Sequence, residues 1–440
     1  MKQILFFLFI ILNNHIYSQT NSFIRLQKEV QVTHTSEGGI LKCEPSVVID
    51  DNIVIVSWND SYGGKTGSVS GVCIGWAISY DYGHTFKFGG YLSKTEKGSY
   101  DGADSWLSKD SDGNFYLEVL SYPKGVHLYF MDRKNLGHWV KLTDPVVSKT
   151  ADKPFLYIED NNHIWISYTD IQKNIQKIYA VCSKNKGKTW SKPILVSNDN
   201  PKIRGGSSIT SYNNRIFITW AEGKKGTLFE NELWYNEISK NVLSTPKLIF
   251  KQEDSKGILT PGYSMGFDHA KSSGHVATPN LTWLNSTNSE SHTINVTFGT
   301  KSKNISKILF FDYDLKNSYW KEPIEVGNIP YSFSRIFASN SSLNDFPAIL
   351  YYDRRNCTTA NCTITDVYLS ILINEKWTDY KINQKSTDWN NIIGDKTYAP
   401  VQRNFGDYIT LSKDKNRLVA AWTDGRNGTS QIYIRVIELK

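Results

Sequence analysis

Residues 43–60 read CEPSVVIDDNIVIVSWND, in which two apolar runs are separated by a polar turn and the second run ends in Trp-Asn-Asp. The same order returns in ADKPFLYIEDNNHIWISYTD at 151–170 and in NFGDYITLSKDKNRLVAAWTD at 404–424. Short alternating runs with Asn, Asp and Gly between them predict paired antiparallel strands, and no helical period of useful length appears. After each pair comes a third apolar run, such as GWAIS at 75–79, and a fourth often follows.

Weaker copies of this unit extend the pattern over the chain, with starts near residues 43, 101, 152, 204, 275, 334 and 404. Repeats of four antiparallel strands indicate an all-β protein, a β-propeller in which each repeat is one blade. Seven blades are favoured, and six is the alternative if the region 251–285 is an insertion. The last copy shows only three strands, so FIRLQKEVQVTHT at 23–35 is expected to supply its outer strand and close the ring.

The first 19 residues, MKQILFFLFIILNNHIYSQ, have a Lys after the initiator Met, an apolar core and a small-residue end, which is typical of a secretory signal peptide. Residues 20–440 are then expected to form a single propeller domain. No later stretch reaches the ~20 apolar residues of a membrane-spanning helix. We therefore expect a secreted, periplasmic or cell-surface bacterial protein, monomeric and without a transmembrane segment.

The formal net charge is +7 and is spread along the chain without a basic block. This distribution disfavours nucleic-acid binding and gives a mild bias towards anionic partners such as acidic glycans. None of the five cysteines has a metal-binding spacing, so neither a metal nor a cofactor is expected. Cys357 and Cys362 could form a local disulfide, Cys43 with Cys73 is a weaker second pair, and Cys182 is expected to be a buried thiol.

Two polar octapeptides follow third strands, SYDYGHTF at 79–86 and SKNKGKTW at 183–190. In each, an Asx side chain can bond its own backbone and a glycine can take a positive φ, so a tight hairpin is expected. The closing aromatic is expected to pack between blades. We assign a structural role to the matching residues, which are Ser79, Asp81, Gly83, Thr85 and Phe86 in the first copy and Ser183, Asn185, Gly187, Thr189 and Trp190 in the second.

The octapeptides resemble the Asp box, Ser-X-Asp-X-Gly-X-Thr-Trp, of sialidases and related propellers. With YYDRRN at 351–356 and AWTDGRNG at 421–428, they make nearly the whole chain look like the sialidase-like (BNR-repeat, exo-α-sialidase-type) family, which contains both enzymes and proteins of unknown activity. The resemblance implies three arginines on a substrate carboxylate, an Asp acid and a Tyr-Glu pair. The chain departs from it where FIRL surrounds Arg25 instead of Arg-Ile-Pro, and no Tyr-Glu pair is assigned.

A propeller brings together, at one mouth, the residues that open each inner strand and those that close the second strand. The residues that open the inner strands, here called openers, include Glu44, Asp152 and Lys153. The residues that end the second strands, here called closers, are mostly acidic, and most of them, such as Asp60, are expected to cap turns or bond neighbouring blades. Residues that break the repeat are better candidates for function, with arginines gripping a carboxylate. We select Asp104, Tyr408 and Glu222 for catalysis, and Arg204, Arg335, Arg403, His275 and Asp407 for substrate binding.

The function predicted from the resemblance and from these residues is hydrolysis or binding of an acidic glycan, with a carboxyl acid and a second group as nucleophile. Two alternatives stay open. One is a non-catalytic propeller that binds glycan or protein through the same mouth. The other is a polysaccharide lyase that cleaves a uronate-containing glycan by β-elimination, with Tyr or His as base.

Overall fold

The computed structural model describes residues 23–68, 71–92, 94, 97–98, 100, 102–172, 175–224, 232–252, 280–284, 293–302, 305–328, 335–344, 346–357, 362–393 and 406–440. Only the backbone is described for residues 224, 280–284, 300–302, 305–306 and 335–337. The predicted signal peptide, His275 and Arg403 lie outside the described residues.

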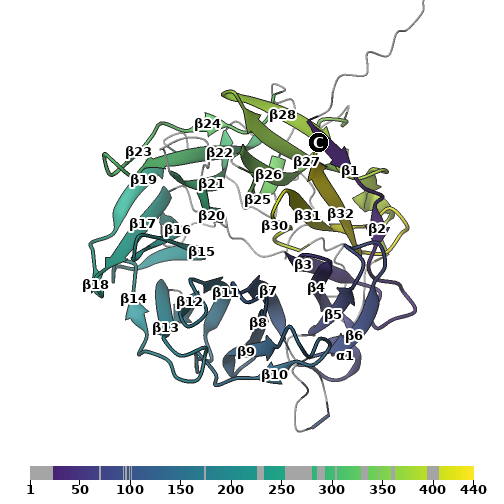
Figure 1. The fold of residues 1–440 in the computed structure, drawn as a ribbon, viewed down its shortest axis with the longest axis horizontal. Coiled ribbons are helices and arrows are strands. Elements are labelled where there is room, and N and C mark those ends of the chain that lie inside the picture. Colours follow the sequence, from purple (N-terminus) through teal and green to yellow (C-terminus); the bar gives the residue numbers. More distant parts are fainter. Residues whose placement is uncertain are drawn as a thin grey trace, which may run out of the picture.

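The strands of the described residues form seven antiparallel sheets around one axis, which confirms the seven-bladed propeller (Figure 1). Blade 1 contains β3 (Lys42–Asp50), β4 (Ile53–Asp60), β5 (Cys73–Ser79) and β6 (Lys87–Tyr91), with the short helix α1 (Tyr62–Lys65) after β4. Blade 2 contains β7 (Ala103–Lys109), β8 (Phe115–Ser121), β9 (Gly125–Met131) and β10 (Val140–Lys141). Blade 3 contains β11 (Ala151–Ile158), β12 (Ile164–Gln172), β13 (Ile175–Ser183) and β14 (Ile194–Leu195).

The other blades repeat this order, with the first strand of each blade nearest the axis. Blade 4 contains β15 (Lys202–Tyr212), β16 (Arg215–Lys224), β17 (Glu232–Ser239), β18 (Val242–Leu243) and β19 (Lys247–Lys251). Blade 5 contains β20 (Asn280–Leu284), β21 (Thr293–Ser302), β22 (Ile305–Asp314), β23 (Tyr319–Trp320) and β24 (Ile324–Glu325). Blade 6 contains β25 (Arg335–Leu343), β26 (Phe346–Asp353), β27 (Ile364–Ile373), β28 (Lys376–Lys381) and β29 (Thr387–Asp388), followed by the 3-10 helix η2 (Trp389–Asn391).

Blade 7 joins the two ends of the described chain. Its strands β30 (Thr410–Asp414), β31 (Arg417–Asp424) and β32 (Gln431–Leu439) are completed by β1 (Ile24–Leu26) and β2 (Val30–Gln31), both paired with β32. The predicted closing strand is therefore confirmed, and Figure 1 shows β1 beside β32 at the C-terminus. Closure supplies the hydrogen-bonding partner that the outer edge of β32 would otherwise lack.

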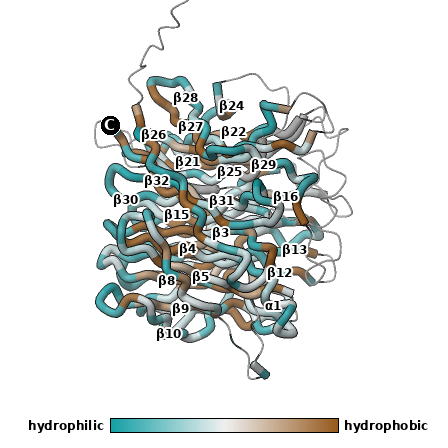
Figure 2. The backbone as a smooth tube through the Cα atoms, turned by 90° about the vertical axis from the view of Figure 1, so that its right-hand side faces the viewer, coloured by the Kyte–Doolittle hydropathy of each residue, from teal (hydrophilic) through white to brown (hydrophobic). Residues whose placement is uncertain are grey.

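Seven hydrophobic clusters fill the spaces between neighbouring blades among the described residues. Leu350 of blade 6 and Trp422 of blade 7, for example, are fully buried in the same cluster. The side view in Figure 2 shows hydrophobic stretches along the stacked strands and hydrophilic ones at many turns. Each blade is thus covered on both faces by its neighbours, which explains the strongly apolar strands of the repeat.

The two octapeptides form the same hairpin, one between β5 and β6 and the other between β13 and β14. The Ser79 hydroxyl accepts a hydrogen bond from the Gly83 N–H at 2.8 Å, and Gly83 has a φ of 83°. Asp81 accepts from the N–H and the hydroxyl of Thr85. Asn185 makes the matching bonds to Thr189 in the second copy. The aromatic residues that close the hairpins, Phe86 and Trp190, pack against the clusters between blades.

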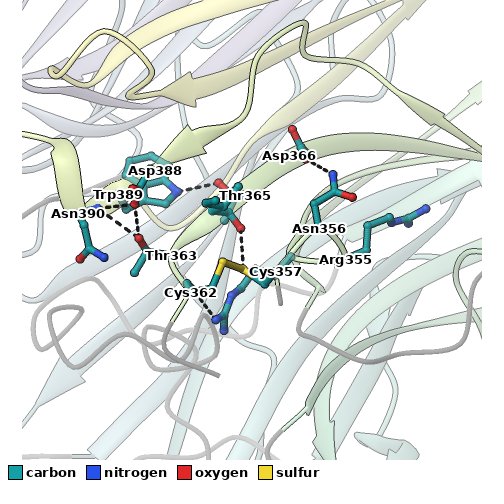
Figure 3. Close-up of a disulfide and its surroundings, with 12 residues drawn as sticks. Arg355, Asn356, Cys357, Cys362, Thr363, Thr365, Asp366, Asp388, Trp389 and Asn390 are labelled. Carbon is teal, nitrogen blue, oxygen red and sulfur yellow. Dashed lines mark hydrogen bonds between the residues drawn. A yellow bond between two sulfur atoms is a disulfide. The ribbon is translucent and has the colours of Figure 1, made fainter. Parts of the chain in front are cut away.

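Cys357 and Cys362 form a disulfide between β26 and β27 (Figure 3). The Arg354 guanidinium donates to the carbonyl of Cys362, and the Trp389 indole donates to the Thr365 hydroxyl at 2.7 Å. These contacts tie the start of β27 to η2.

The weaker pairing, Cys43 with Cys73, is wrong, because neither forms a disulfide and both are buried on β3 and β5, which β4 separates. Cys182 is also free and buried.

The hairpins give a matched pair of variants for stability. Partial burial works against ionisation of Asp81, but the hydrogen bonds from Thr85 and Ser79 outweigh it and lower its pKa to about 2. Since this lies below the unfolded value of about 3.9, its stabilisation is present above that pH and is lost as the pH falls towards 2. Asp81→Ala should lower the free energy of unfolding by about 1 kcal/mol at neutral pH, a loss limited by solvent screening.

Denaturant titrations of wild type and variant from neutral pH to acid would measure this difference. Asn185→Ala is the control, because it removes the same bonds without a titratable group. Its effect should stay constant with pH. A difference for Asp81→Ala that is equally constant would contradict the interpretation.

Candidate active site

The inner strands all begin at one end of the ring, which we call the mouth. Strand pairing places each opener beside the end of the second strand of its own blade, as in the pairs Lys42 with Asp60 and Arg204 with Glu222. The octapeptide hairpins lie at the opposite end, because Ser79 pairs with Val54 near the start of β4. The polar residues that open the inner strands are thereby gathered around the axis.

A β-bulge recurs where five of the inner strands open, between Cys43/Ser46, Ala103/Trp106, Asp152/Phe155, Gly205/Ser208 and Ile336/Ser339. The first bulge residue in blades 1 to 4 has left-handed backbone: Glu44 (φ 55°), Asp104 (φ 50°), Lys153 (φ 45°) and Gly206 (φ 60°). Glycine adopts this conformation freely, whereas other residues are strained by ~1–3 kcal/mol. Three blades therefore hold a charged side chain where glycine would be relaxed.

These three charged side chains meet near the axis, with Lys153 at the centre of the group. Its Nζ lies 2.8 Å from Asp407 Oδ2, 3.3 Å from Asp104 Oδ1 and 3.9 Å from Glu44 Oε1. Asn59 braces the group by donating its amide to Glu44 Oε2 at 2.6 Å and accepting from the Asp104 N–H at 3.0 Å. We call Glu44, Asp104, Lys153 and Asp407 the axial cluster.

The axial cluster contains more acids than cations, and this imbalance shifts the pKa values of Glu44 and Lys153. Burial raises the pKa of Glu44 well above its usual range; Lys153 opposes the shift, while Asp407 and a hydrogen bond with Asp104 add to it. The pKa of the adjacent Asp152 is raised by burial and by the charge of Asp104. Burial alone would lower the pKa of Lys153, but the surrounding carboxylates outweigh it and raise the pKa well above normal. The site thus holds a cationic amine beside carboxyls, Glu44 and Asp152, whose ionised forms are disfavoured by burial.

A small, partly open hollow lies beside the axial cluster. Asp104, Lys153 and Tyr408 contribute its charged and phenolic groups. The Trp106 ring lies 4.5 Å from the Phe155 ring and 6.0 Å from the Tyr408 ring, measured between centroids. The remaining lining residues are Pro154, Gly206, Ser207, Ala338 and Ile409. Apolar rings beside a few polar groups make a surface suited to a small ring such as a sugar.

The predicted site residues divide into two groups. Asp104 and Tyr408 line the hollow together with Lys153, whose amine lies 5.8 Å from the Tyr408 ring centroid. Asp407 does not line it but contacts the same amine at 2.8 Å. Burial, followed by the charges of Glu44 and Asp104, raises the pKa of Tyr408 well above normal, so its phenol stays neutral.

Arg204 and Glu222 instead bind each other, with Nε 2.8 Å from Oε2 and both side chains buried. Further bonds join the Arg204 guanidinium to Asn200 and to the carbonyl of Gln176, so its described contacts lie in blades 3 and 4. Arg335 opens β25 opposite Asp353. The predictions for His275 and Arg403 fall outside the described residues.

Arginines beside the closers in blades 6 and 7 make one repeated contact. Arg355 pairs with Asp353 at 2.7 Å and lies 3.8 Å from the Tyr368 ring centroid. Arg426 pairs with Asp424 and lies 4.5 Å from the Tyr433 ring centroid. These arginines and acids hold neighbouring strands together.

Sequence analysis selected neither Glu44 nor Lys153 for function, although both are openers. The signal that could have found them is the opening position itself, since Glu44, Asp104 and Lys153 are equivalent in the repeat. No group of three or more His, Cys, Asp or Glu side chains is arranged to hold a metal ion within the described residues.

No family model and no curated protein matches this sequence. Solved structures resemble it in fold. A protein of unknown function from Dyadobacter fermentans has 12% identity and a TM-score of 0.52 over 95% of this chain and 100% of its own. An α-L-arabinofuranosidase of Fusarium graminearum, bound to an iminosugar inhibitor, has 13% identity and a TM-score of 0.52 over 93% and 97%.

An ulvan lyase of polysaccharide lyase family 25, bound to -[GlcA(1-4)Rha3S]-, has 9% identity and a TM-score of 0.52 over 92% of this chain and 95% of its own. At these identities the likeness shows the fold alone. Among the described residues, no helix has the length and apolar character to cross a membrane.

Replacement of the central cation tests the cohesion of the axial cluster. Lys153→Met leaves buried carboxyls without their counter-charge, so the free energy of unfolding at neutral pH should fall by about 3–5 kcal/mol. The pKa values of Glu44 and Asp152 are already raised, and loss of Lys153 raises them further. Groups with a raised folded pKa destabilise the fold as the pH rises, so the deficit should shrink below pH ~4, where unfolded carboxyls also bind protons.

Unfolding by denaturant at a series of pH values measures the deficit. Lys109→Met is the matched control, because Lys109 Nζ lies 2.8 Å from both Asp50 and Asp414 but is more exposed, at 24% against 11% for Lys153. Its loss should be smaller. Equal losses for the two variants would show that the axial cluster is no more tightly coupled than a partly exposed ion pair.

Proposed function

We propose that this protein is a glycan-hydrolysing enzyme whose active site is the hollow beside the axial cluster. The supporting observation is that Glu44, Asp104 and Lys153, three strained and charged bulge residues, lie together, and that Asp104 and Lys153 line the hollow. Glycine adopts the left-handed conformation of the bulge without strain, as Gly206 does, so a bulge with only a structural role needs no charged residue. Strain that persists in three equivalent positions favours a functional role.

Glycoside hydrolysis needs a protonated carboxyl and a second carboxylate across the scissile bond. Asp104 lines the hollow, and we assign it the role of general acid. Burial and neighbouring acids raise the pKa of Glu44, which shares a hydrogen bond with Asp104 and can replace the proton that Asp104 gives to the leaving oxygen. In this arrangement Glu44 supplies the proton and Asp104 contacts the sugar.

Asp407 is our candidate for the second carboxylate. Its Oδ2 and Asp104 Oδ1 both contact Lys153 Nζ, at 2.8 and 3.3 Å. The two oxygens are therefore separated by no more than the sum of these distances, about 6 Å, an upper bound below the ~6.5–9.5 Å of inverting glycosidases. Lys153 fixes both carboxyl groups, while Trp106, Phe155 and Tyr408 offer apolar ring faces to the sugar.

Hydrolysis is favoured over β-elimination by the states of the other polar groups at the hollow. A lyase needs a base to remove the proton beside a uronate carboxylate. Lys153 is held in its cationic form and Tyr408 as a neutral phenol, since the pKa of each is raised well above normal. Preference for an acidic glycan stays a prediction that depends on Arg335 and Arg403, because Arg204 is engaged by Glu222. Export likewise stays a prediction from residues 1–19.

The proposal is tested by incubating the protein with arabinan, sialosides and uronate polysaccharides and measuring new reducing ends. Ultraviolet absorbance of unsaturated sugars detects elimination. Asp104→Asn should reduce kcat by ~10²–10⁴-fold on the glycan that is cleaved, as expected for loss of a general acid. Glu44→Gln should also reduce kcat, because Asp104 loses its proton source.

Asp81→Asn, at the opposite end of the ring, is the control and should leave turnover unchanged. Unchanged kcat in Asp104→Asn would remove Asp104 from the mechanism. Binding of a glycan by calorimetry without any turnover would replace the proposal with a non-catalytic binding propeller, and an unsaturated product would replace it with a lyase.

A further inference from the structure

Three tyrosines form a group on the mouth side of blade 1, outside the axial cluster. The Tyr62 ring is stacked on the Tyr91 ring, with 4.7 Å between their centroids. The Tyr100 ring lies 5.6 Å from that of Tyr91 and 6.4 Å from that of Tyr62. All three side chains are partly exposed, and none of them lines the hollow. We call Tyr62, Tyr91 and Tyr100 the tyrosine cluster.

The tyrosine cluster depends on long connections at the mouth. The connection from β4 to β5 covers residues 61–72 and contains α1, whereas the equivalent connections of blades 2 and 3 cover 122–124 and 173–174. Tyr100 lies in the connection from β6 to β7, and its N–H donates to the Thr66 hydroxyl, just after α1, at 3.1 Å. Blade 1 is therefore extended at the mouth by residues that blades 2 and 3 lack between these strands.

Blades 6 and 7 show what the fold places at the position of Tyr62. Two residues after the closer, these blades carry Arg355 and Arg426, and the N–H of each donates to the closing acid. The guanidinium of each arginine also returns to that acid. Tyr62 keeps the first contact, since its N–H donates to Asp60 at 2.9 Å, but a tyrosine ring replaces the guanidinium. Blade 1 thus breaks the repeat at this position.

The acid of blade 1 is satisfied without the Tyr62 side chain. Asp60 is fully buried and accepts hydrogen bonds from the Gly39 N–H at 2.7 Å, the Trp58 indole at 3.2 Å and the Tyr91 hydroxyl at 3.3 Å. Tyr91 is held in place by this bond. The Tyr62 ring has no part in holding the closer, and it stacks on Tyr91 at the partly exposed surface.

Consecutive residues of β4 connect the tyrosine cluster to the axial cluster. Asn59 bonds to two members of the axial cluster, and the next residue, Asp60, accepts from the Tyr62 N–H. Tyr100 precedes Asp104 by four residues, so their Cα atoms are at most about 14 Å apart. The tyrosine cluster therefore lies on the same face of the ring as the hollow and a short distance from it.

We propose that the tyrosine cluster is a glycan-binding subsite, which holds the part of the sugar chain that extends from the hollow across blade 1. This inference rests on the proposed function. Because the hollow is small and partly open, the remainder of a chain bound there must lie on the mouth surface. Tyrosine offers an apolar ring face to the C–H groups of a sugar and a hydroxyl to its polar edge. Rings that are already packed together lose little freedom when the sugar binds.

The subsite is tested by calorimetry with arabinan and uronate oligosaccharides, from disaccharide to hexasaccharide, on protein that carries Asp104→Asn to prevent cleavage. Tyr62→Ala and Tyr100→Ala should each weaken binding of the hexasaccharide about tenfold and binding of the disaccharide less, because only the longer chain reaches the rings. Tyr62→Phe keeps the ring and should retain most of the affinity. Tyr82→Ala is the control, since Tyr82 is 41% exposed at the opposite end of the ring, and should leave binding unchanged.

Equal losses for short and long chains, or no loss in either alanine variant, would overturn the subsite, as would failure of every glycan to bind the parent protein. Melting temperatures show whether each variant folds, and Tyr100→Ala carries the test alone if Tyr62→Ala does not. A wild type that cleaves no glycan, with length-dependent binding that both variants weaken, would reject only the proposed function. Cleavage whose KM for long chains is the same in both variants would reject only the subsite.

Discussion

Closure of the ring is the constraint on which the other features depend. Every blade is apolar on both faces, so it is stable only between two neighbours, and the first and last blades must meet. The pairing of Ile24 with Leu439 and of Val30 with Ile434 achieves this by placing strands from opposite ends of the chain in one sheet. Once the ring is closed, all inner strands begin at the same mouth, and residues hundreds of positions apart, such as Glu44 and Asp407, become neighbours.

The acids that close the second strands are used to build this ring. The Trp58, Trp220 and Trp422 indoles each donate to the acid two residues later, at 3.2, 3.4 and 3.0 Å. The tryptophans are fully buried, so these bonds satisfy their only polar group inside the core. In these three blades the recurring aromatic-X-acid motif is thereby explained by a hydrogen bond between the second strand's own side chains. The residues that open the inner strands vary from blade to blade, and these are the ones to which we assign the chemistry.

The architecture was predictable because it depends on repetition. Strand alternation, the octapeptide hairpins and the missing outer strand of the last repeat together indicate seven closed blades. Three residues selected from the sequence, Asp104, Asp407 and Tyr408, lie in or beside the axial cluster because they occupy opening positions, and their roles stay predictions. Lys153 was not selected, because a single Lys in a basic chain carries no signal until three carboxylates are seen around it. The pairing of Arg204 with Glu222 was equally invisible, because strand register decides it.

Charge balance at the mouth connects the fold to the proposed chemistry. Lys153 can neutralise one of the carboxylates beside it, and burial makes further ionisation costly. Burial accordingly raises the pKa of Glu44 and of Asp152, and a raised pKa is the condition that an acid catalyst requires near neutral pH. A site built only to bind a neutral sugar would gain nothing from left-handed, strained positions that bring acids together. The backbone strain at Glu44, Asp104 and Lys153 brings a proton-donating carboxyl next to a second carboxyl. The strain is explained if the site uses this pair for catalysis.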